Sequence, residues 1–325
     1  MILNEKKTIN GELREWLLKV FAFTDSLSRT PLARRNCPVC GSVRSEFFVN
    51  NGYLDFAKCT DCSLIFMNPA SAPSLVDGGF KGDDQLVMEY FRIKSRHRKV
   101  VSERPDPERD GQLCDIYQWK KSGRLLDIGC SFGDFLRKAS HFYSVEGVEV
   151  NPLTARIASQ DFTVHQHYLH EVKLPQVYDI VTLHQILYGV PDPVGLFLEV
   201  SKILKHDGIL YVNTPNADSH ALRLYQGKAN HVYGYMTQNV FNRKSLKALA
   251  DRTGFRVRSF RTEWLDVYLT DLLVFLETPA EFIHKKNTHL TGYEDRIKQE
   301  DEFHRSLGLE LGDRGNYLVA ILEKT

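Results

Sequence analysis

The chain has 325 residues, 42% of them hydrophobic, and a formal net charge of +1 at pH 7. This suits a globular protein of one large or two modest domains, and the near-neutral charge gives no overall attraction to nucleic acid or to a membrane. No apolar run approaches the ~18 residues of a membrane span, and residues 1–10 lack the apolar core of a signal peptide. We therefore expect a cytoplasmic protein with no membrane span.

The first predicted element is an amphipathic helix within residues 11–28, part of an N-terminal segment that we place at 1–34. Its apolar positions recur at helical spacing, which suits packing on the body of the protein or on a second copy of the chain. The oligomeric state therefore stays open between monomer and homodimer. The apolar positions are Trp16, Leu17, Val20, Phe21, Phe23 and Leu27.

Four cysteines follow in two pairs, Cys37 with Cys40 and Cys59 with Cys62. The pattern Cys-x2-Cys-x18-Cys-x2-Cys falls within the spacing of four-thiolate zinc sites, and it predicts a zinc ribbon over residues 35–68. Because four thiolates leave no open coordination position, the predicted Zn²⁺ is structural and not catalytic. The alternative is four reduced core cysteines without a metal.

Residues 69–119 are predicted to connect the ribbon to the body. A loop rich in Pro, Ser and Gly covers 69–82, and a helical pattern covers 85–103. The helix carries a basic cluster, for which a solvated surface and a grip on the phosphates of an acceptor are the two interpretations. The cluster consists of Arg92, Lys94, Arg96, His97, Arg98 and Lys99.

The stretch 124–136 is the most informative part of the chain. A buried strand ends near Asp127, and Gly129 and Gly133 precede a helix pattern. Glycines allow a ligand close to the backbone, and the N–H groups at a helix start bind polar or anionic groups. Glu149 ends the next predicted strand, where a carboxylate can hold a ribose diol.

The glycine turn is not a dinucleotide fingerprint. Counting from Gly129, the third and sixth positions of Gly-x-Gly-x-x-Gly are Ser131 and Asp134. The pattern Asp-x-Gly-x-x-x-Gly, followed by an acid about 20 residues later, instead resembles the S-adenosylmethionine (SAM) methyltransferases of the Rossmann-like class. The resemblance covers residues 120–325. Ser131 stands where a glycine is commoner.

The resemblance implies a cofactor site along one edge of the sheet. The turn would surround the methionine part of SAM, the acid would bind the ribose, residues 168–170 would border the adenine, and His184 would line the pocket. The implied SAM residues are Asp127, Gly129, Ser131, Gly133, Glu149, Val150, Tyr168, Leu169 and His184.

From residue 124 the chain alternates strand and helix patterns, which predicts a parallel α/β sheet. The resemblance implies a seven-stranded methyltransferase sheet with helices on both faces, whose last strand inserts antiparallel between the fifth and sixth. Residues 205–208 are predicted to form a turn before the fifth strand. A helix over 265–276 is predicted to cover the acceptor site. The predicted strands are 124–130, 144–150, 163–168, 178–184, 208–213, 255–263 and 316–323.

Acceptor chemistry needs alignment of the nucleophile with the methyl group, and a general base helps where a proton is lost. The family's usual Leu-Glu-His-Val-Pro-Asp-Pro is here Leu-Tyr-Gly-Val-Pro-Asp-Pro at 187–193, so a base at that histidine cannot be transferred. The catalytic candidates come from the loops beyond the fourth and fifth strands. They are His184, Tyr188, His231 and Tyr233.

A zinc ribbon followed by a SAM-type domain resembles bacterial methyltransferases that act on small molecules, including sugars and nucleotide sugars. The leading hypothesis is methyl transfer to an oxygen or carbon of such an acceptor. One alternative is an RNA base methyltransferase that uses the ribbon to bind RNA, against which the near-neutral charge weighs. The other is a non-catalytic scaffold whose zinc ribbon binds a protein partner.

Overall fold

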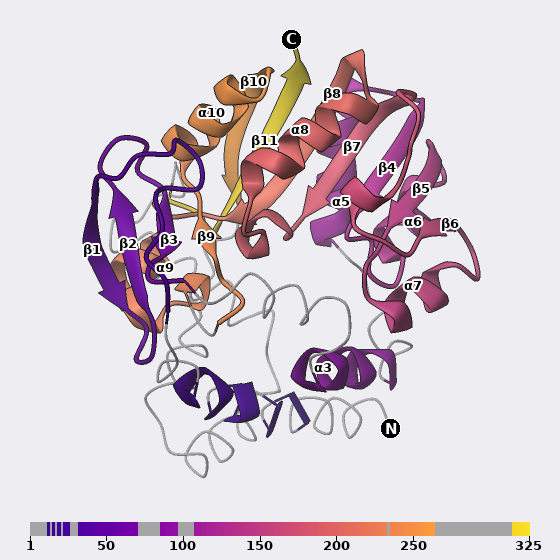
Figure 1. Cartoon of the computed structure of the whole chain (residues 1–325). Coiled ribbons are helices and arrows are strands. Elements are labelled where there is room, and N and C mark those ends of the chain that lie inside the picture. The colour runs from indigo at the N-terminus through magenta and orange to yellow at the C-terminus, as the bar shows by residue number, and fades with distance from the viewer. Residues whose placement is uncertain are drawn as a thin grey trace, which may run out of the picture.

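The computed structural model describes residues 12–26 except 14, 17 and 21, and residues 32–70, 85–96, 107–232, 235–263 and 314–325. Its main sheet has the strand order β10-β11-β8-β7-β4-β5-β6 (Figure 1). Strand β11 runs antiparallel between β8 and β10, which confirms the predicted seven-stranded methyltransferase sheet. The strands are β4 (Arg124–Ile128), β5 (Ser144–Val148), β6 (Thr163–His165), β7 (Tyr178–His184), β8 (Leu204–Pro215), β10 (Phe255–Glu263) and β11 (Tyr317–Lys324).

Helices cover both faces of this sheet, as predicted. Neighbouring residues on the strands point to opposite faces, so Leu126 and Val181 pack with one set of helices while Leu125 and Ile180 pack with the other. The first face is covered by α8 (Pro193–Ile203) and α10 (Arg243–Arg252). The second face is covered by α5 (Pro107–Trp119), α6 (Asp134–Ala139) and α7 (Pro152–Ala158).

Strand β8 begins earlier than the sequence predicts. Tyr178 of β7 pairs with Leu204, and two residues later Ile180 pairs with Ile209. Residues 205–208 therefore bulge out of the ladder within one continuous strand. The prediction that a turn at 205–208 precedes the strand is therefore wrong. These residues lie within β8, where the bulge accommodates them without ending the pairing with β7.

A second, smaller sheet has the order β1-β2-β3-β9. Its first three strands, β1 (Ser45–Asn50), β2 (Asp55–Cys59) and β3 (Ile65–Met67), belong to the predicted ribbon. The fourth strand, β9 (Asn239–Val240), comes from the body, far from β3 in sequence, and lies beside β3 (Figure 1). The boundaries of a separate ribbon domain therefore remain a prediction, because the sheet includes a strand from the body.

The two sheets also share one apolar core. Val39, Leu64 and Phe66 of the ribbon belong to the same buried cluster as Leu246 and Leu249 of α10. This continuity fixes the ribbon against the body, so side chains from both can form a common site.

The described part of the N-terminal segment is helical and packs on α3 (Gln85–Arg96). The indole N–H of Trp16 donates to the carbonyl of Leu86 at 2.7 Å, and the Trp16 and Tyr90 rings lie 4.9 Å apart. Arg96 of the basic cluster pairs with Glu12 at 2.8 Å. His97, Arg98, Lys99 and the predicted helix at 265–276 lie outside the described residues. Among the described residues, no helix is long and apolar enough to cross a membrane.

Arg35 joins the ribbon to two segments of the body. Its guanidinium donates to the carbonyls of Gln238 at 2.9 Å, Met67 at 3.2 Å and Pro191 at 3.4 Å. Burial lowers its pKa to about 10, which still leaves it charged at neutral pH. No sequence motif predicted this contact.

Replacing Arg35 should therefore loosen the junction between ribbon and body. We expect Arg35→Ala to lower the free energy of unfolding by about 2–4 kcal/mol, because buried carbonyls lose a charged donor. Urea unfolding followed by circular dichroism measures this. Arg44→Ala is the control, since Arg44 is largely exposed and pairs with Asp61 at the surface. Equal stability of both variants would contradict the assignment.

Candidate cofactor site and metal centre

The glycine turn between β4 and α6 is built from left-handed backbone. Gly129 has φ 76° and Gly133, the N-cap of α6, has φ 77°. A side chain at 129 would be strained, because the backbone is left-handed and a Cβ would lie 2.2 Å from Cδ1 of Ile186, which would have to move. Ser131 also has a positive φ, 50°, which explains why this position favours glycine. The turn lies at the carboxyl edge of the sheet, between β4 and α6.

Glu149 closes the turn from the neighbouring strand. One carboxylate oxygen accepts from the backbone N–H of Ser131 at 2.8 Å, and the other accepts from the N–H of Asn151 at 2.7 Å. The side chain is 6% exposed, and burial raises the pKa of its carboxyl group. Each oxygen keeps acceptor capacity after these bonds, which fits the two hydroxyls of a ribose.

Asp127 lies at the same edge but faces the core. It accepts a hydrogen bond from the hydroxyl of Thr182 at 2.7 Å, and burial raises its pKa to about 7. Arg109 of α5 acts electrostatically on both Asp127 and His184. Sequence reasoning missed Arg109, whose only signal was a cation shortly before the first strand of the sheet.

The residues predicted beside the adenine follow the ends of the neighbouring parallel strands β5 and β6. Leu169 is buried, while Val150 and Tyr168 are half-buried. Leu169 opens a short 3-10 helix, Leu169–Glu171, whose Glu171 carboxylate accepts from the backbone N–H of Tyr168 at 2.9 Å. Glu171 thus places an acid one residue beyond the segment 168–170 that the resemblance assigns to the adenine.

His184 ends β7 between two aromatic rings. Its ring centroid lies 4.2 Å from that of Phe135 and 5.1 Å from that of Tyr211. Both ring nitrogens are buried and have no hydrogen-bond partner in the described part of the chain. Burial, aided by Arg109, lowers its pKa to about 3. The imidazole is therefore neutral and a weak base, which fits a pocket wall better than proton abstraction.

The other catalytic candidates have different environments in the structure. Tyr188 is half-buried, and burial raises its pKa to about 12, so its phenol stays protonated and can only donate or accept a hydrogen bond. His231 is buried, with Nε2 2.7 Å from the carbonyl oxygen of Asn316, and burial lowers its pKa to about 4. Its bond to the backbone suits the fixing of a loop. Tyr233 lies outside the described residues.

A polar chain that sequence reasoning missed connects the ends of three strands. Gln185, which has a φ of 54°, bonds to Asn213, and Asn213 bonds to Glu263. Glu263 also pairs with Arg261 at 2.8 Å. Burial raises the pKa of Glu263, although Arg261 opposes this. Glu263 is therefore a partly buried carboxylate with a raised pKa at the ligand edge of the sheet, which makes it a candidate general base in place of His184.

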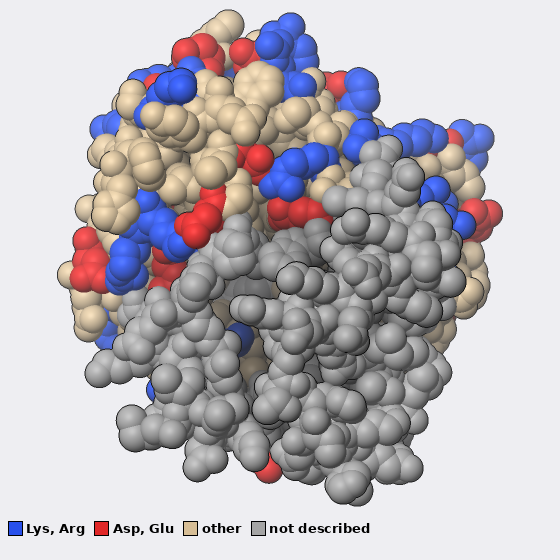
Figure 2. All heavy atoms as spheres, turned by 180° about the vertical axis from the view of Figure 1, so that it is seen from behind, with Lys and Arg blue, Asp and Glu red and all other residues tan. Residues whose placement is uncertain are grey.

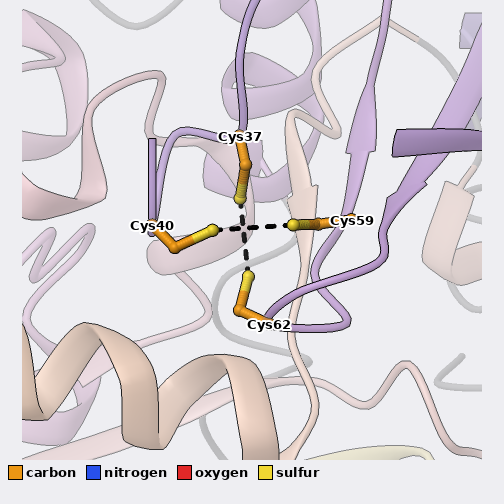
Figure 3. A group of neighbouring side chains, drawn as sticks. All are labelled: Cys37, Cys40, Cys59 and Cys62. Atoms are coloured by element: carbon orange, nitrogen blue, oxygen red, sulfur yellow. Dashed lines mark hydrogen bonds between the residues drawn. The ribbon is translucent and has the colours of Figure 1, made fainter. Parts of the chain in front are cut away.

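The four cysteines of the ribbon converge on one point (Figure 3). Their sulfurs all lie within 4.8 Å of one another, and the pairs Cys37–Cys62 and Cys40–Cys59 are 3.5 Å apart. A tetrahedral zinc with Zn–S bonds near 2.3 Å separates its sulfurs by about 3.8 Å. The four thiols therefore fit Zn²⁺. No other such group occurs in the part of the chain that the structure describes.

The two cysteine pairs form matching turns. Gly41 follows the first pair with φ 76°, and its N–H donates to the carbonyl of Cys37 at 2.9 Å. Ser63 follows the second pair with φ 64°, and its N–H donates to the carbonyl of Cys59 at 3.0 Å. The positive φ of Ser63 shows that the second turn adopts the same backbone without a glycine.

Comparison with known proteins agrees with this geometry. Residues 108–259 match the profile of a methyltransferase domain family. The chain is 27% identical over 152 residues to a ubiquinone biosynthesis O-methyltransferase of Yersinia enterocolitica, covering 42% of this chain and 63% of that protein. A protein of the same name from Photorhabdus laumondii is 27% identical over 158 residues, with 43% and 64% covered. The chain thus spans less than two thirds of these relatives.

Among solved structures, the chain is similar to a SAM-dependent methyltransferase, described as a possible histamine N-methyltransferase, from Thermotoga maritima. The TM-score is 0.48 at 20% identity, with 77% of this chain and all of that one covered. A SAM-dependent methyltransferase from Archaeoglobus fulgidus has a TM-score of 0.47 at 19% identity, with 72% and 99% covered.

The strand order and the domain match agree with each other. Residues 108–259 match a methyltransferase domain family, and the main sheet has the strand order of the Rossmann-like methyltransferases of class I. SAM is the cofactor of these methyltransferases, and the glycine turn with Glu149 fits that cofactor.

Metal binding should support the fold of the ribbon. We expect about one Zn²⁺ per purified chain, and near-complete loss of it in the double variant Cys59→Ser/Cys62→Ser, with a lower unfolding midpoint. Metal analysis by mass spectrometry and thermal unfolding measure the two effects. Cys114→Ser is the control, because Cys114 lies outside the cluster. Unchanged zinc content in the double variant would refute the site.

Glu149 should control cofactor affinity. We expect Glu149→Ala to weaken binding of S-adenosylhomocysteine at least tenfold, because the ribose loses its acceptors and the turn loses its bond to Ser131. Isothermal calorimetry measures the affinity. Glu146→Gln is a matched control on β5, the strand that Glu149 follows, since Glu146 accepts a hydrogen bond from Tyr178 at 2.9 Å, away from the turn. A variant that binds as tightly as the wild type would exclude this role.

Proposed function

We propose that this chain is a SAM-dependent methyltransferase that methylates an oxygen of a small-molecule acceptor. The observation that carries the proposal is the left-handed turn at 129–133, joined to Glu149 at the carboxyl edge of a methyltransferase sheet. The similarity to O-methyltransferases of ubiquinone biosynthesis supports oxygen as the accepting atom. Within this class, a sugar or nucleotide sugar is our proposed acceptor, with carbon as the alternative atom.

Each residue of the site would have a separate role in methyl transfer. The cofactor, when bound, supplies an electrophilic methyl group. Glu149 and the turn would hold and orient it, and His184 would exclude water beside the reacting edge. Glu263 would accept the proton of the acceptor hydroxyl, with Arg261 and Asn213 holding its carboxylate in place. Most of the acceleration would come from this positioning.

The alternatives differ in the acceptor and in turnover. On the face in Figure 2, acidic and basic side chains are interspersed over the described surface, and no extended basic stripe lies there. The described part of this face therefore offers RNA no continuous basic path. Methyl transfer to any small molecule would exclude the scaffold hypothesis.

Turnover can be tested without knowing the acceptor. We expect formation of S-adenosylhomocysteine when the protein is mixed with SAM and pools of phenols, sugars or nucleotide sugars, and no stimulation by total RNA. Mass spectrometry of the cofactor detects the product. Cofactor binding without turnover in every pool would favour the scaffold, and stimulation by RNA alone would favour the RNA methyltransferase.

Glu263 should determine the acid limb of the pH profile. Because burial raises its pKa above the ordinary carboxyl value, we expect kcat to fall as the pH drops through that raised pKa. Glu263→Gln should lower kcat at least a hundredfold and remove the limb. Glu323→Gln is the control, since Glu323 pairs with Arg256 at the opposite end of the sheet. A limb that persists in Glu263→Gln would assign the base elsewhere.

A further inference from the structure

A cavity of about 260 Å³ lies between the zinc ribbon and the body, outside the cofactor site described above. We call it the ribbon pocket. One wall comes from β1, β2 and the turn after the second cysteine pair, and the other from the loop beyond β8 and from α9 (His220–Tyr225). The side chains relevant here are Phe48, Lys58, Ser63, Asp218, Arg223 and Arg314.

The lining of the ribbon pocket is positively charged. It contains three cations, Lys58, Arg223 and Arg314, against the single acid Asp218. Asp218 is engaged within the protein, where its carboxylate accepts from Asn242 at 3.4 Å. Arg314 donates one guanidinium N–H to the backbone carbonyl of Asp218 at 3.1 Å. The acid therefore does not neutralise all three cations.

Lys58 and Arg223 make no ion pair with any described residue. Lys58 is half-buried in the wall, while Arg223 is exposed at its rim. Three cations beside a single acid leave the lining with excess positive charge, and a bound anion would relieve the repulsion between them. This charge arrangement selects an anionic ligand.

The remaining groups suit a phosphorylated small molecule. The hydroxyl of Ser63 can donate to a phosphate oxygen, and the half-buried ring of Phe48 offers an apolar face. Lys58 immediately precedes Cys59, and Ser63 immediately follows Cys62. The metal centre therefore fixes two of the groups that would contact the ligand.

The ribbon pocket also lies within reach of the reacting edge. Asn213 of the polar chain and Asp218 of the pocket are five residues apart in sequence. Because an extended chain advances at most about 3.5 Å per residue, their backbones lie within about 18 Å of each other. An elongated acceptor could place an anionic group in the pocket and a hydroxyl beside β8.

We propose that the ribbon pocket binds the diphosphate group of a small-molecule acceptor. Lys58 and Arg223 provide the charge, Ser63 provides a hydrogen bond, and the zinc ribbon holds this wall in place. The inference rests on the proposed methyl transfer for its biological use, but anion binding can be measured independently.

The test is calorimetry on the full-length, zinc-loaded protein with inorganic pyrophosphate as probe. We expect saturable binding that weakens at least tenfold in Lys58→Ala/Arg223→Ala. The control is Lys202→Ala/Arg256→Ala, which removes two exposed cations outside the pocket and should bind pyrophosphate as the wild type does. S-adenosylhomocysteine binding, measured on the same samples, should be unchanged in all variants.

Uridine diphosphate and a short single-stranded RNA distinguish the sources of the phosphate. Binding of uridine diphosphate at least as tight as that of pyrophosphate, lost in the pocket variant, supports the proposal. No pyrophosphate binding, or equal loss in both double variants, would overturn it, as would RNA binding tighter than either small probe. Failure of cofactor binding with intact pyrophosphate binding would overturn the proposed function alone.

Discussion

The structure depends on the junction at which β9 completes the sheet of the zinc ribbon. Asn239 and Val240 of the body pair with β3. The guanidinium of Arg35 donates to the carbonyl of Gln238, the residue immediately before them. A ribbon of three short strands has little core of its own. By sharing β9 and an apolar cluster with α10, the ribbon becomes one wall of the body. A metal site far from the cofactor in sequence can then shape a ligand site.

At the cofactor edge, the backbone of the glycine turn and the side chain of Glu149 depend on each other. The turn at 129–133 needs left-handed residues because β4 must reverse into α6 over a very short distance. That conformation exposes the N–H of Ser131, which Glu149 accepts. Burial makes the carboxylate costly to ionise, while two backbone donors favour its charged form. The same geometry that closes the turn thus prepares acceptors for ribose hydroxyls.

Local patterns in the sequence predicted the elements whose signal is local. The cysteine spacing, the glycine turn and the strand–helix alternation each lie within short windows, and the structure brings Cys37 and Cys62 together as the spacing requires. Contacts between distant segments had no such signal. Arg35 contacts Pro191 and Gln238, and the chain from Gln185 through Asn213 to Glu263 joins three strands. Nothing in the neighbourhood of any one of these residues indicates its partners.

Acid–base roles depend on burial, which a sequence does not display. The sequence suggests His184 as a general base because histidine ordinarily titrates near neutrality. Two aromatic rings and a nearby arginine remove that property, since they favour the neutral ring. Burial has the opposite effect on Glu263, because it favours the protonated acid and moves its pKa toward the range in which a base is useful. The same loss of water therefore weakens the histidine as a base and strengthens the carboxylate, and the acceptor side of the site should be sought at the end of β10.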